Sequence, residues 1–249
     1  MSGIADSVLT VISHYAARPD DCLQSLFARL SELAGNILVV VNSDEQENAQ
    51  LRELKSASNG RFIGVLMVPN RGMNIGAWDA AYRAFPDFGY YVFLQDECLL
   101  LDPAYEARYK AALGTAGVGM VGETINPKWD FTWEVMRKSP LNYQFPDAIS
   151  QKPIDRVSFY LACMEKWRID PGPTARHLRA LVWGFSRQCL RTIDGFPIGV
   201  TKEECIAAEI GVSRKVVSAD YQLLQIGLKP FDCFGHVEWR SDGVAKIPV

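Results

Sequence analysis

Four short apolar runs in the first hundred residues limit the folds open to this chain more than any other feature of its sequence. They are rich in aliphatic and aromatic side chains and cover Val8–Ile12, Ile37–Val41, Phe62–Val68 and Tyr90–Leu94. Runs in which apolar residues do not alternate with polar ones are typical of strands buried on both faces of a parallel sheet. The segments between the runs have helical patterns, so the order βαβαβαβ is predicted. This order indicates an α/β fold with a mostly parallel sheet flanked by helices.

Helices are predicted in the three segments that connect these strands. Pro19 and the acids after it suit the positive end of a helix, and leucines recur at helical spacing from there towards Gly35. A polar helix is predicted over residues 44–58. A third helix is predicted over Met73–Phe85, because Pro86 stops it there.

The composition is that of an ordinary globular chain, and it excludes several classes of function. The chain has 249 residues with 26 basic and 29 acidic side chains, and its net charge of −3 gives no global attraction to nucleic acid or to an anionic membrane. The length suits a single domain over residues 1–249. The six cysteines lack the CxxC spacing of zinc or redox sites, so no metal is expected on them.

The amino terminus and the length of the apolar runs bear on location. Residues 1–7 show no basic region followed by an apolar stretch, and no apolar run approaches the roughly 20 residues that a membrane span needs. We therefore expect no transmembrane segment and a cytoplasmic location. Peripheral association with the inner face of the membrane stays open.

Polar residues follow each of the four predicted strands. In an open parallel sheet, ligands bind in the crevice beyond the carboxyl ends of the strands. The four strand ends are Ser13-His14-Tyr15, Asn42-Ser43-Asp44, Pro69-Asn70-Arg71-Gly72 and Gln95-Asp96-Glu97. The fourth strand runs directly into two adjacent acids, which indicates a divalent cation held by oxygen ligands.

Two common phosphate-binding motifs are missing from the sequence. A dinucleotide site needs GxGxxG after the first strand and a P-loop needs GxxxxGK(S/T), whereas the first strand is followed by Ala16-Ala17-Arg18-Pro19. A phosphate-bearing ligand would then be neutralised by a metal and by side chains. Asp96 and Glu97 suit this role.

The strand ends resemble those of GT-A-fold nucleotide-sugar glycosyltransferases, nearest to glycosyltransferase family 2 and rhamnosyltransferase-like proteins. The similarity lies in Val8–Tyr15, Ile37–Asp44, Asn70–Gly76 and Tyr90–Glu97, in this order and spacing. It implies that a nucleotide-sugar donor binds at the strand ends. The residues to which it gives this role are Ser13, His14, Tyr15, Asn42, Ser43, Asn70, Gly72, Asn74, Gln95 and Asp96.

The family's DxD element falls on Gln95-Asp96-Glu97, with glutamine in place of its first acid. The resemblance implies that Glu97, together with Asp96, binds Mg²⁺ or Mn²⁺ that bridges the two phosphates of the donor. A late histidine completes the metal site in some members, and His236 stands in that place. Because glutamine leaves fewer charges for a cation, the alternative is a GT-A-like protein that binds a nucleotide sugar or a glycan without catalysis.

A second stretch of similarity, over residues 181–197, corresponds to the acceptor side of the family. A pair of acids follows this stretch in the family. The resemblance therefore implies that Glu204 takes the proton of the acceptor hydroxyl, with Glu203 and Glu209 as further choices. Glu203 and Glu204 also follow Thr201 in the way that acids follow the cap residue of a helix, so a structural role is the alternative.

Two other features of this part of the chain have both a functional and a structural interpretation. Trp183 and Trp129 are expected either to stack on an acceptor sugar or to be buried. The segment from Lys128 to Arg179 holds more basic than acidic residues, which suits a phosphorylated ligand or a solvated face.

As a whole, the resemblance implies a glycosyltransferase that moves a sugar from a nucleotide-sugar donor to a glycan or lipid-linked acceptor. It further implies inversion at the sugar carbon and a part in the synthesis of a bacterial surface polysaccharide. Residues 1–101 would form the half that binds the nucleotide sugar, and residues 102–249 the half that binds the acceptor.

A helix-turn-helix is a competing interpretation of residues 201–223. Two short helices would be separated near Gly211, and Arg214 and Lys215 would open the second one. Acidic residues outnumber basic ones in this segment. Because contacts with phosphates supply much of the affinity for DNA, this charge disfavours DNA binding, and nucleic acid is not an expected partner.

Overall fold

The computed structural model of the protein describes residues 4–33, 35–43, 62–147 and 151–238. The helix predicted over residues 44–58 lies outside them. In the described part of the chain, the elements are η1 (Ile4–Asp6), β1 (Val8–Tyr15), α1 (Asp21–Ser31), β2 (Ile37–Asn42), β3 (Phe62–Val68), α3 (Met73–Ala84), β4 (Tyr90–Gln95), β5 (Cys98–Leu100), α4 (Tyr105–Leu113), β6 (Val118–Gly122), α5 (Trp133–Lys138), β7 (Gln144–Pro146), β8 (Pro153–Asp155), α6 (Arg156–Lys166), β9 (Val182–Ser186), α7 (Arg187–Ile193), α8 (Lys202–Ser218), β10 (Gln222–Gln225) and β11 (Phe234–His236).

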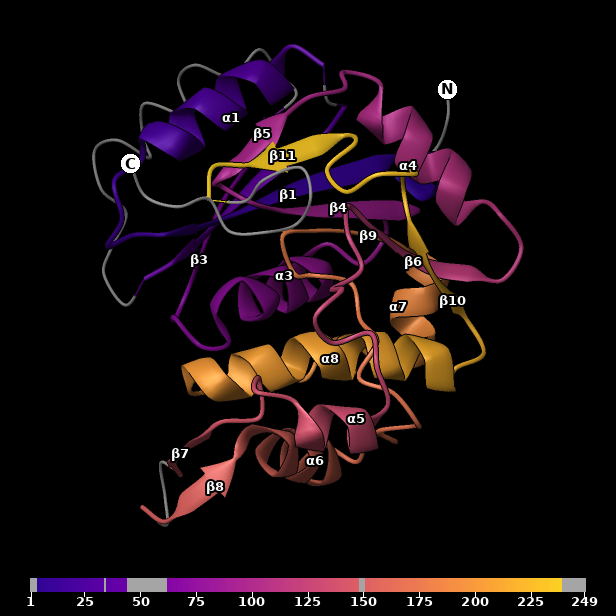
Figure 1. Ribbon diagram of the computed structural model, residues 1–249. Coiled ribbons are helices and arrows are strands. Elements are labelled where there is room, and N and C mark those ends of the chain that lie inside the picture. The colour runs from indigo at the N-terminus through magenta and orange to yellow at the C-terminus, as the bar shows by residue number, and fades with distance from the viewer. Residues whose placement is uncertain (1–3, 34, 44–61, 148–150, 239–249) are drawn as a thin grey trace.

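A central sheet crosses the molecule (Figure 1). Among the described residues it has seven strands in the order β3-β2-β1-β4-β9-β6-β10. Strands β1 to β4 are parallel to one another, and β9 runs antiparallel between β4 and β6. The four apolar runs are thus confirmed as strands of a mostly parallel sheet. Because these strands are parallel, their carboxyl ends meet at one edge of the sheet.

Helices cover both faces of this sheet. In Figure 1, α1 and α4 lie above the sheet, and α3, α7 and α8 lie below it. The residues of β1 divide between the two faces: Val8 and Ile12 belong to the same core cluster as Leu26 of α1, and Leu9 belongs to the cluster that contains Trp78 of α3. Burial on both faces explains why polar residues do not alternate with apolar ones in β1, β2 and β4, whereas β3, at the edge of the sheet, is only partly buried.

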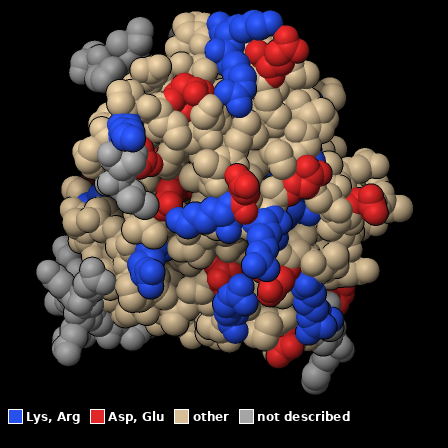
Figure 2. Space-filling view, turned by 90° about the horizontal axis from the view of Figure 1, so that it is seen from below, with Lys and Arg blue, Asp and Glu red and all other residues tan. Residues whose placement is uncertain are grey.

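A further layer of α5, α6 and the β7–β8 hairpin lies beneath α8 (Figure 1). Val157 and Tyr160 of α6 share a core cluster with Ala207 and Ile210 of α8, so this layer packs onto the rest of the domain. Seen from below, its outer face carries Lys and Arg interspersed with Asp and Glu (Figure 2). On this face, positive and negative side chains are therefore mixed.

The helix-turn-helix interpretation of residues 201–223 is wrong. Helix α8 runs from Lys202 to Ser218 without a break, and Gly211 lies buried inside it. The glycine permits close packing there, because an added Cβ would lie only 3.2 Å from Ile169 Cδ1. Arg214 is also buried and does not face outward. No helix in the described part of the chain is both long and apolar enough to cross a lipid bilayer.

Candidate functional site

The carboxyl ends of β1, β2 and β4 and the start of α3 enclose a cavity of about 350 Å³, which we call the edge pocket. Most of the residues predicted to bind a donor line it. The lining residues are Ser13, Tyr15, Arg18, Asn42, Asn70, Met73, Asn74, Gln95, Asp96 and Glu97. His14, Ser43 and Gly72 share these strand ends and loops without lining the cavity.

Asn42, at the end of β2, lines the edge pocket and has a buried acceptor atom. The residue is 3% exposed, and its Nδ2 donates a hydrogen bond of 3.0 Å to the Met73 carbonyl. Its Oδ1 is buried, and no described residue donates a hydrogen bond to it. Because buried polar atoms nearly always have a partner, this position suits an N–H or O–H group of a ligand.

His14 and Asp96 form a buried pair at the edge pocket, in which Asp96 lines the cavity and His14 lies behind it. His14 Nδ1 lies 2.5 Å from Asp96 Oδ2, and both residues are 5% exposed. The backbone N–H of Asp96 donates to the Ser13 carbonyl at 3.1 Å. One carboxylate oxygen of Asp96 is therefore bound to His14, and this contact fixes the end of β4 against β1.

Glu97 lies where several polar side chains meet. Its Oε1 is 2.6 Å from Arg18 Nη1, and its Oε2 is 3.8 Å from His236 Nε2. His236 Nε2 is also 3.3 Å from Gln95 Oε1, while its Nδ1 accepts the N–H of Glu238 at 3.1 Å. Since Nδ1 accepts, the proton of the neutral imidazole lies on Nε2. The antiparallel pairing of β11 with β5 brings this late histidine to the end of β4.

These groups fit a divalent cation that takes most of its ligands from a bound substrate. No cluster of three His, Cys, Asp or Glu side chains exists among the described residues, so the protein does not form a complete cage. Glu97 and His236 nevertheless bring a carboxylate and an imidazole nitrogen within 3.8 Å of each other. Mg²⁺ is commonly held by one or two side chains together with substrate phosphates and waters. Glu97 suits such a site, and His236 Nε2 could join it only if its proton moved to Nδ1 and the hydrogen bond from the Glu238 N–H were lost.

The loop that leads into α3 requires glycine at two positions. Gly72 has a φ of 79°, and a Cβ added at Gly76 would lie 1.8 Å from the carbonyl oxygen of Arg71. Neither position accepts a larger residue without movement of the backbone. The glycines thereby allow the start of α3 to lie against the strand ends, where Asn74 becomes part of the wall of the edge pocket.

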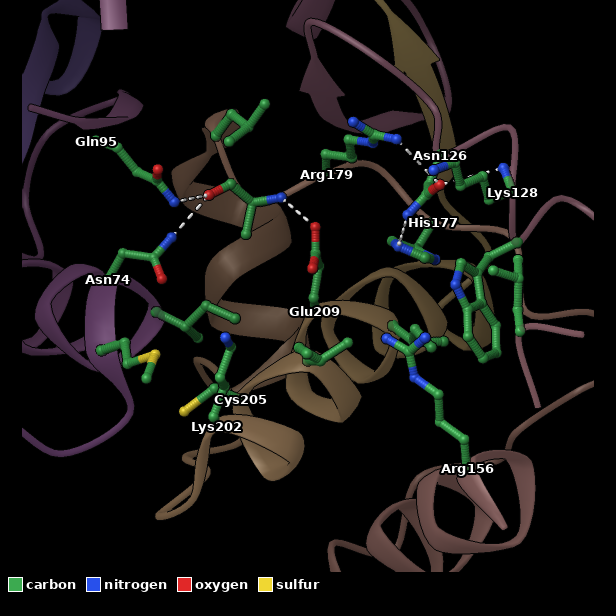
Figure 3. A pocket seen from close by; sticks show the side chains of 18 residues that line it. Asn74, Gln95, Asn126, Lys128, Arg156, His177, Arg179, Lys202, Cys205 and Glu209 are labelled. Carbon is green, nitrogen blue, oxygen red and sulfur yellow. Dashed lines mark hydrogen bonds between the residues drawn. The ribbon is translucent and has the colours of Figure 1, made fainter. Parts of the chain in front are cut away.

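A second cavity, which we call the α8 pocket, adjoins the edge pocket and has a volume of about 390 Å³ (Figure 3). Residues of α8, of the start of α3 and of the segment 177–181 line it. Met73, Asn74 and Gln95 line both cavities. Ligands in the two pockets would therefore lie side by side.

Among the described residues that line the α8 pocket, Glu209 alone is acidic. Its Oε1 accepts the Ala180 N–H at 2.5 Å, and the Ala180 carbonyl accepts hydrogen bonds of 2.7 Å from Asn74 and from Gln95. Figure 3 shows Glu209 between these two amides on one side and His177 on the other. A half-buried carboxylate thus lies where the two pockets meet, and it can accept a proton there.

Glu204, the predicted base, lies instead at the start of α8. Its Oε2 accepts the N–H groups of Val200 and Thr201 at 2.6 and 3.3 Å, and its Oε1 lies 2.8 Å from Lys166 Nζ. Burial raises the pKa of Glu204, but Lys166 and the two N–H groups outweigh burial and lower it. With Thr201 it forms a capping box. The structural role predicted as the alternative is confirmed, and neither Glu204 nor Glu203 lines the α8 pocket.

The two tryptophans differ in their surroundings. Trp183 is fully buried in β9, its ring centroid lies 5.1 Å from that of Trp78, and its Nε1 donates to the Leu178 carbonyl. The expectation that Trp183 stacks on an acceptor is therefore wrong, because a central strand buries the ring. Trp129 lines the α8 pocket, and the Arg156 guanidinium lies 5.0 Å from its ring.

The α8 pocket also carries basic side chains that the sequence did not single out. They are Lys128, Arg156, Arg179 and Lys202. The positive excess between Lys128 and Arg179 was the only signal for the first three, and it could not show which of the basic residues face one cavity; Lys202 lies outside that segment. Burial lowers the pKa of Arg179, and the nearby Glu209 carboxylate raises it.

Comparisons with known proteins agree with the topology. No protein-family model and no curated protein matches the sequence. Among solved structures, a mannosyltransferase from Pyrobaculum calidifontis in complex with GDP-Man and Mn²⁺ matches over 88% of this chain and 54% of its own, with a TM-score of 0.57 and 14% identity. Glucosyl-3-phosphoglycerate synthase from Mycobacterium tuberculosis, with Mn²⁺ and UDP, matches over 93% and 72%, with a TM-score of 0.52 and 14% identity. GalNAc-T7, with UDP, GalNAc and Mn²⁺, matches over 92% and 43%, with a TM-score of 0.59 and 10% identity.

The chain has the GT-A fold. The predicted fold class is thus confirmed, as a single domain with a mostly parallel sheet flanked by helices. The chain spans about half the length of the mannosyltransferase that it matches. In this GT-A fold, the edge pocket lies where the parallel strands end, and the α8 pocket lies beside it under α3.

Proposed function

We propose that this protein is a glycosyltransferase that moves a sugar from a nucleotide-sugar donor to an acceptor hydroxyl. The observation that carries the proposal is the pair of adjoining pockets with a shared wall. The edge pocket has the place and the polar lining for a nucleotide, and the α8 pocket holds the Glu209 carboxylate at its border with the edge pocket. Transfer between two substrates needs this arrangement, because the reacting groups must be held together.

On the donor side, the strand ends supply groups for a nucleoside diphosphate. Asn42 Oδ1 would accept a hydrogen bond from the base or the ribose, and Arg18 would meet the phosphates. Glu97 would hold Mg²⁺ or Mn²⁺, with His236 as a further ligand once its Nε2 is deprotonated, and the Mn²⁺ in the three similar solved structures supports this cofactor. A bound cation would neutralise negative charge on the departing diphosphate.

On the acceptor side, Glu209 would act as the general base. The acceptor oxygen bonds to the anomeric carbon of the sugar while the bond from that carbon to the diphosphate breaks, and its electron pair leaves with the phosphate. The proton of the acceptor hydroxyl passes to the Glu209 carboxylate. This role moves from Glu204, the first choice from the sequence, to Glu209, because Glu209 lines the α8 pocket whereas Glu204 binds the start of α8.

The finer parts of the proposal come from the family resemblance. They are transfer of a hexose or deoxyhexose with inversion, a glycan or lipid-linked acceptor, and a part in bacterial surface polysaccharide synthesis in the cytoplasm, including its membrane face. Trp129 would pack against the acceptor sugar in the α8 pocket.

Nucleotide release from UDP-, GDP- and dTDP-sugars in the presence of Mn²⁺ tests the proposal. Glu209→Gln should slow turnover by roughly 10²- to 10⁴-fold and leave nucleotide binding intact, since glutamine can still accept the Ala180 N–H. Glu204→Gln is the matched control, and it should keep turnover because its carboxylate binds Lys166 and the helix start.

Two results would contradict this account. Full turnover in Glu209→Gln together with loss in Glu204→Gln would return the base to Glu204. Nucleotide binding without release from any donor sugar would favour the alternative of a nucleotide-sugar-binding protein without catalysis.

A further inference from the structure

We infer that the α8 pocket binds a phosphate group carried by the acceptor. The assignment of this phosphate to an acceptor rests on the proposed function, whereas the binding of phosphate in the pocket can be measured separately. The basis is a concentration of fixed positive charge in one cavity next to the proposed transfer site.

Arg156 is held in place by aromatic rings at the edge of the α8 pocket. Its guanidinium carbon lies 5.0 Å from the ring of Trp129, 5.1 Å from that of Tyr143 and 5.4 Å from that of Tyr160. Its Nε donates a hydrogen bond of 2.6 Å to the Tyr160 hydroxyl. The rings and the hydroxyl fix the plane of the guanidinium, so less freedom is lost when its remaining N–H groups bind an oxyanion.

Arg179 supplies a second guanidinium from the opposite wall, as Figure 3 shows. The residue is 5% exposed, and its Nη2 lies 3.4 Å from Asn126 Oδ1, which also accepts the backbone N–H of Lys128 at 3.2 Å. Asn126 Nδ2 is then directed to His177 Nε2 at 3.2 Å, while His177 Nδ1 donates to the Ala175 carbonyl at 2.8 Å. This network orders the wall that carries Arg179.

Among the described residues that line the α8 pocket, basic side chains outnumber acidic ones. Lys128 and Lys202 are exposed at the rim of the α8 pocket. Glu209 is the one acidic residue among the described residues that line the pocket, against the four basic residues Lys128, Arg156, Arg179 and Lys202. No described carboxylate forms an ion pair with Arg156, Lys128 or Lys202. A phosphate monoester, with a charge of about −1.5 to −2 at pH 7, offsets this excess better than a singly charged carboxylate does.

The positive charge of the α8 pocket would position an acceptor for the proposed sugar transfer. With its phosphate on Arg156 and Arg179, an acceptor would reach towards Glu209 and the shared wall of Asn74 and Gln95, where its hydroxyl would meet the donor sugar (Figure 3). A soluble sugar phosphate and a prenyl-linked phosphate carry the same chemical group.

Calorimetric titration of the full chain tests this inference. The ligands are glucose 6-phosphate and farnesyl phosphate, with glucose and farnesol as uncharged counterparts. We expect at least one of the two phosphates to bind, and neither uncharged compound. Arg156→Gln should weaken phosphate binding by roughly 10- to 100-fold. The control Arg168→Gln, which changes an exposed arginine outside both pockets, should not.

The second variant, Lys202→Gln, changes an exposed rim residue at the start of α8, and it should also weaken phosphate binding. Binding of only the soluble or only the prenyl phosphate, with this dependence on Arg156 and Lys202, supports the inference and names the source. The inference is overturned if no phosphate binds, or if phosphate binds to Arg156→Gln and to Lys202→Gln as strongly as to wild type.

If nucleotide with Mn²⁺ still binds to a protein that binds no phosphate, the proposed function stands without the acceptor phosphate. If phosphate binds in the α8 pocket but no nucleotide binds, the proposed function is wrong, and the bound phosphate compound is not an acceptor.

Discussion

Among single residues, Glu123 is a buried carboxyl group whose contribution to the free energy of unfolding is expected to decrease as the pH rises. It is 1% exposed, just after β6, and accepts hydrogen bonds from Tyr109 Oη at 2.7 Å and from the N–H groups of Asp232 and Cys233 at 2.7 and 3.1 Å. These contacts fasten the chain just before β11. Burial raises the pKa of Glu123 more than the three hydrogen bonds lower it.

The raised pKa of Glu123 predicts the sign of a pH effect. Its stabilising contribution is complete below the pKa of the unfolded chain and is lost as the pH rises through the higher folded pKa. The difference in free energy of unfolding between wild type and Glu123→Gln should therefore fall from pH 4 to pH 7, by up to about 1.4 kcal/mol for each unit of pKa shift. Urea unfolding at several pH values measures it.

The exposed Glu134 provides the control for this experiment, since its side chain is 79% exposed. Glu134→Gln should leave the pH dependence unchanged. If the stability of wild type relative to Glu123→Gln instead increased with pH, the folded pKa of Glu123 would be lowered and the account of its burial would be wrong.

At the scale of elements, the contact of α3 with the strand ends depends on Gly76. Helix propensity alone predicts that Gly76→Ala stabilises the protein by about 1 kcal/mol. The structure predicts the opposite sign, because the new Cβ would lie 1.8 Å from the Arg71 carbonyl oxygen. We expect a loss of about 1–3 kcal/mol in the free energy of unfolding, together with weaker nucleotide binding as Asn74 moves.

Gly35→Ala is a suitable comparison for Gly76→Ala, because the nearest atom to its added Cβ is 3.9 Å away. Gly35→Ala should change the free energy of unfolding by no more than about 0.5 kcal/mol. It should leave nucleotide binding unchanged. A Gly76→Ala variant as stable as wild type would show that α3 does not need this close approach.

The sequence predicted well those elements whose pattern of apolar residues, glycine and proline lies within one short segment. Strands β1 to β4 were predicted because each is a continuous apolar run, and α1 and α3 because leucine spacing, glycine and proline mark them. The break near Gly211, which the disfavoured helix-turn-helix interpretation required, is absent for a physical reason. Glycine there serves close packing against Ile169 inside a continuous helix, and the same residue type marks turns elsewhere.

At the scale of the whole molecule, the site depends on which distant segments the sheet brings together. Polar residues at the strand ends predicted the edge pocket, since parallel strands end at a common edge. The α8 pocket could not be predicted, because Lys128, Arg156, Arg179 and Lys202 come from separate segments that meet only in the folded chain. The sequence favoured Glu204 as the base over Glu209, and only the packing of α8 shows that Glu209 is the one that lines the α8 pocket.

The central claim is that the edge pocket binds a nucleoside diphosphate together with a divalent cation. The most direct test is the melting temperature of the full chain with UDP, GDP, dTDP, ADP or CMP, each with and without Mn²⁺. At about 100 times its Kd, the right nucleotide adds about 2.7 kcal/mol of stability, which should raise Tm by roughly 5–10 °C for a chain of this length. This rise should require Mn²⁺ and be lost in Glu97→Ala. No rise with any of these nucleotides, or an equal rise in Glu97→Ala, would contradict the claim.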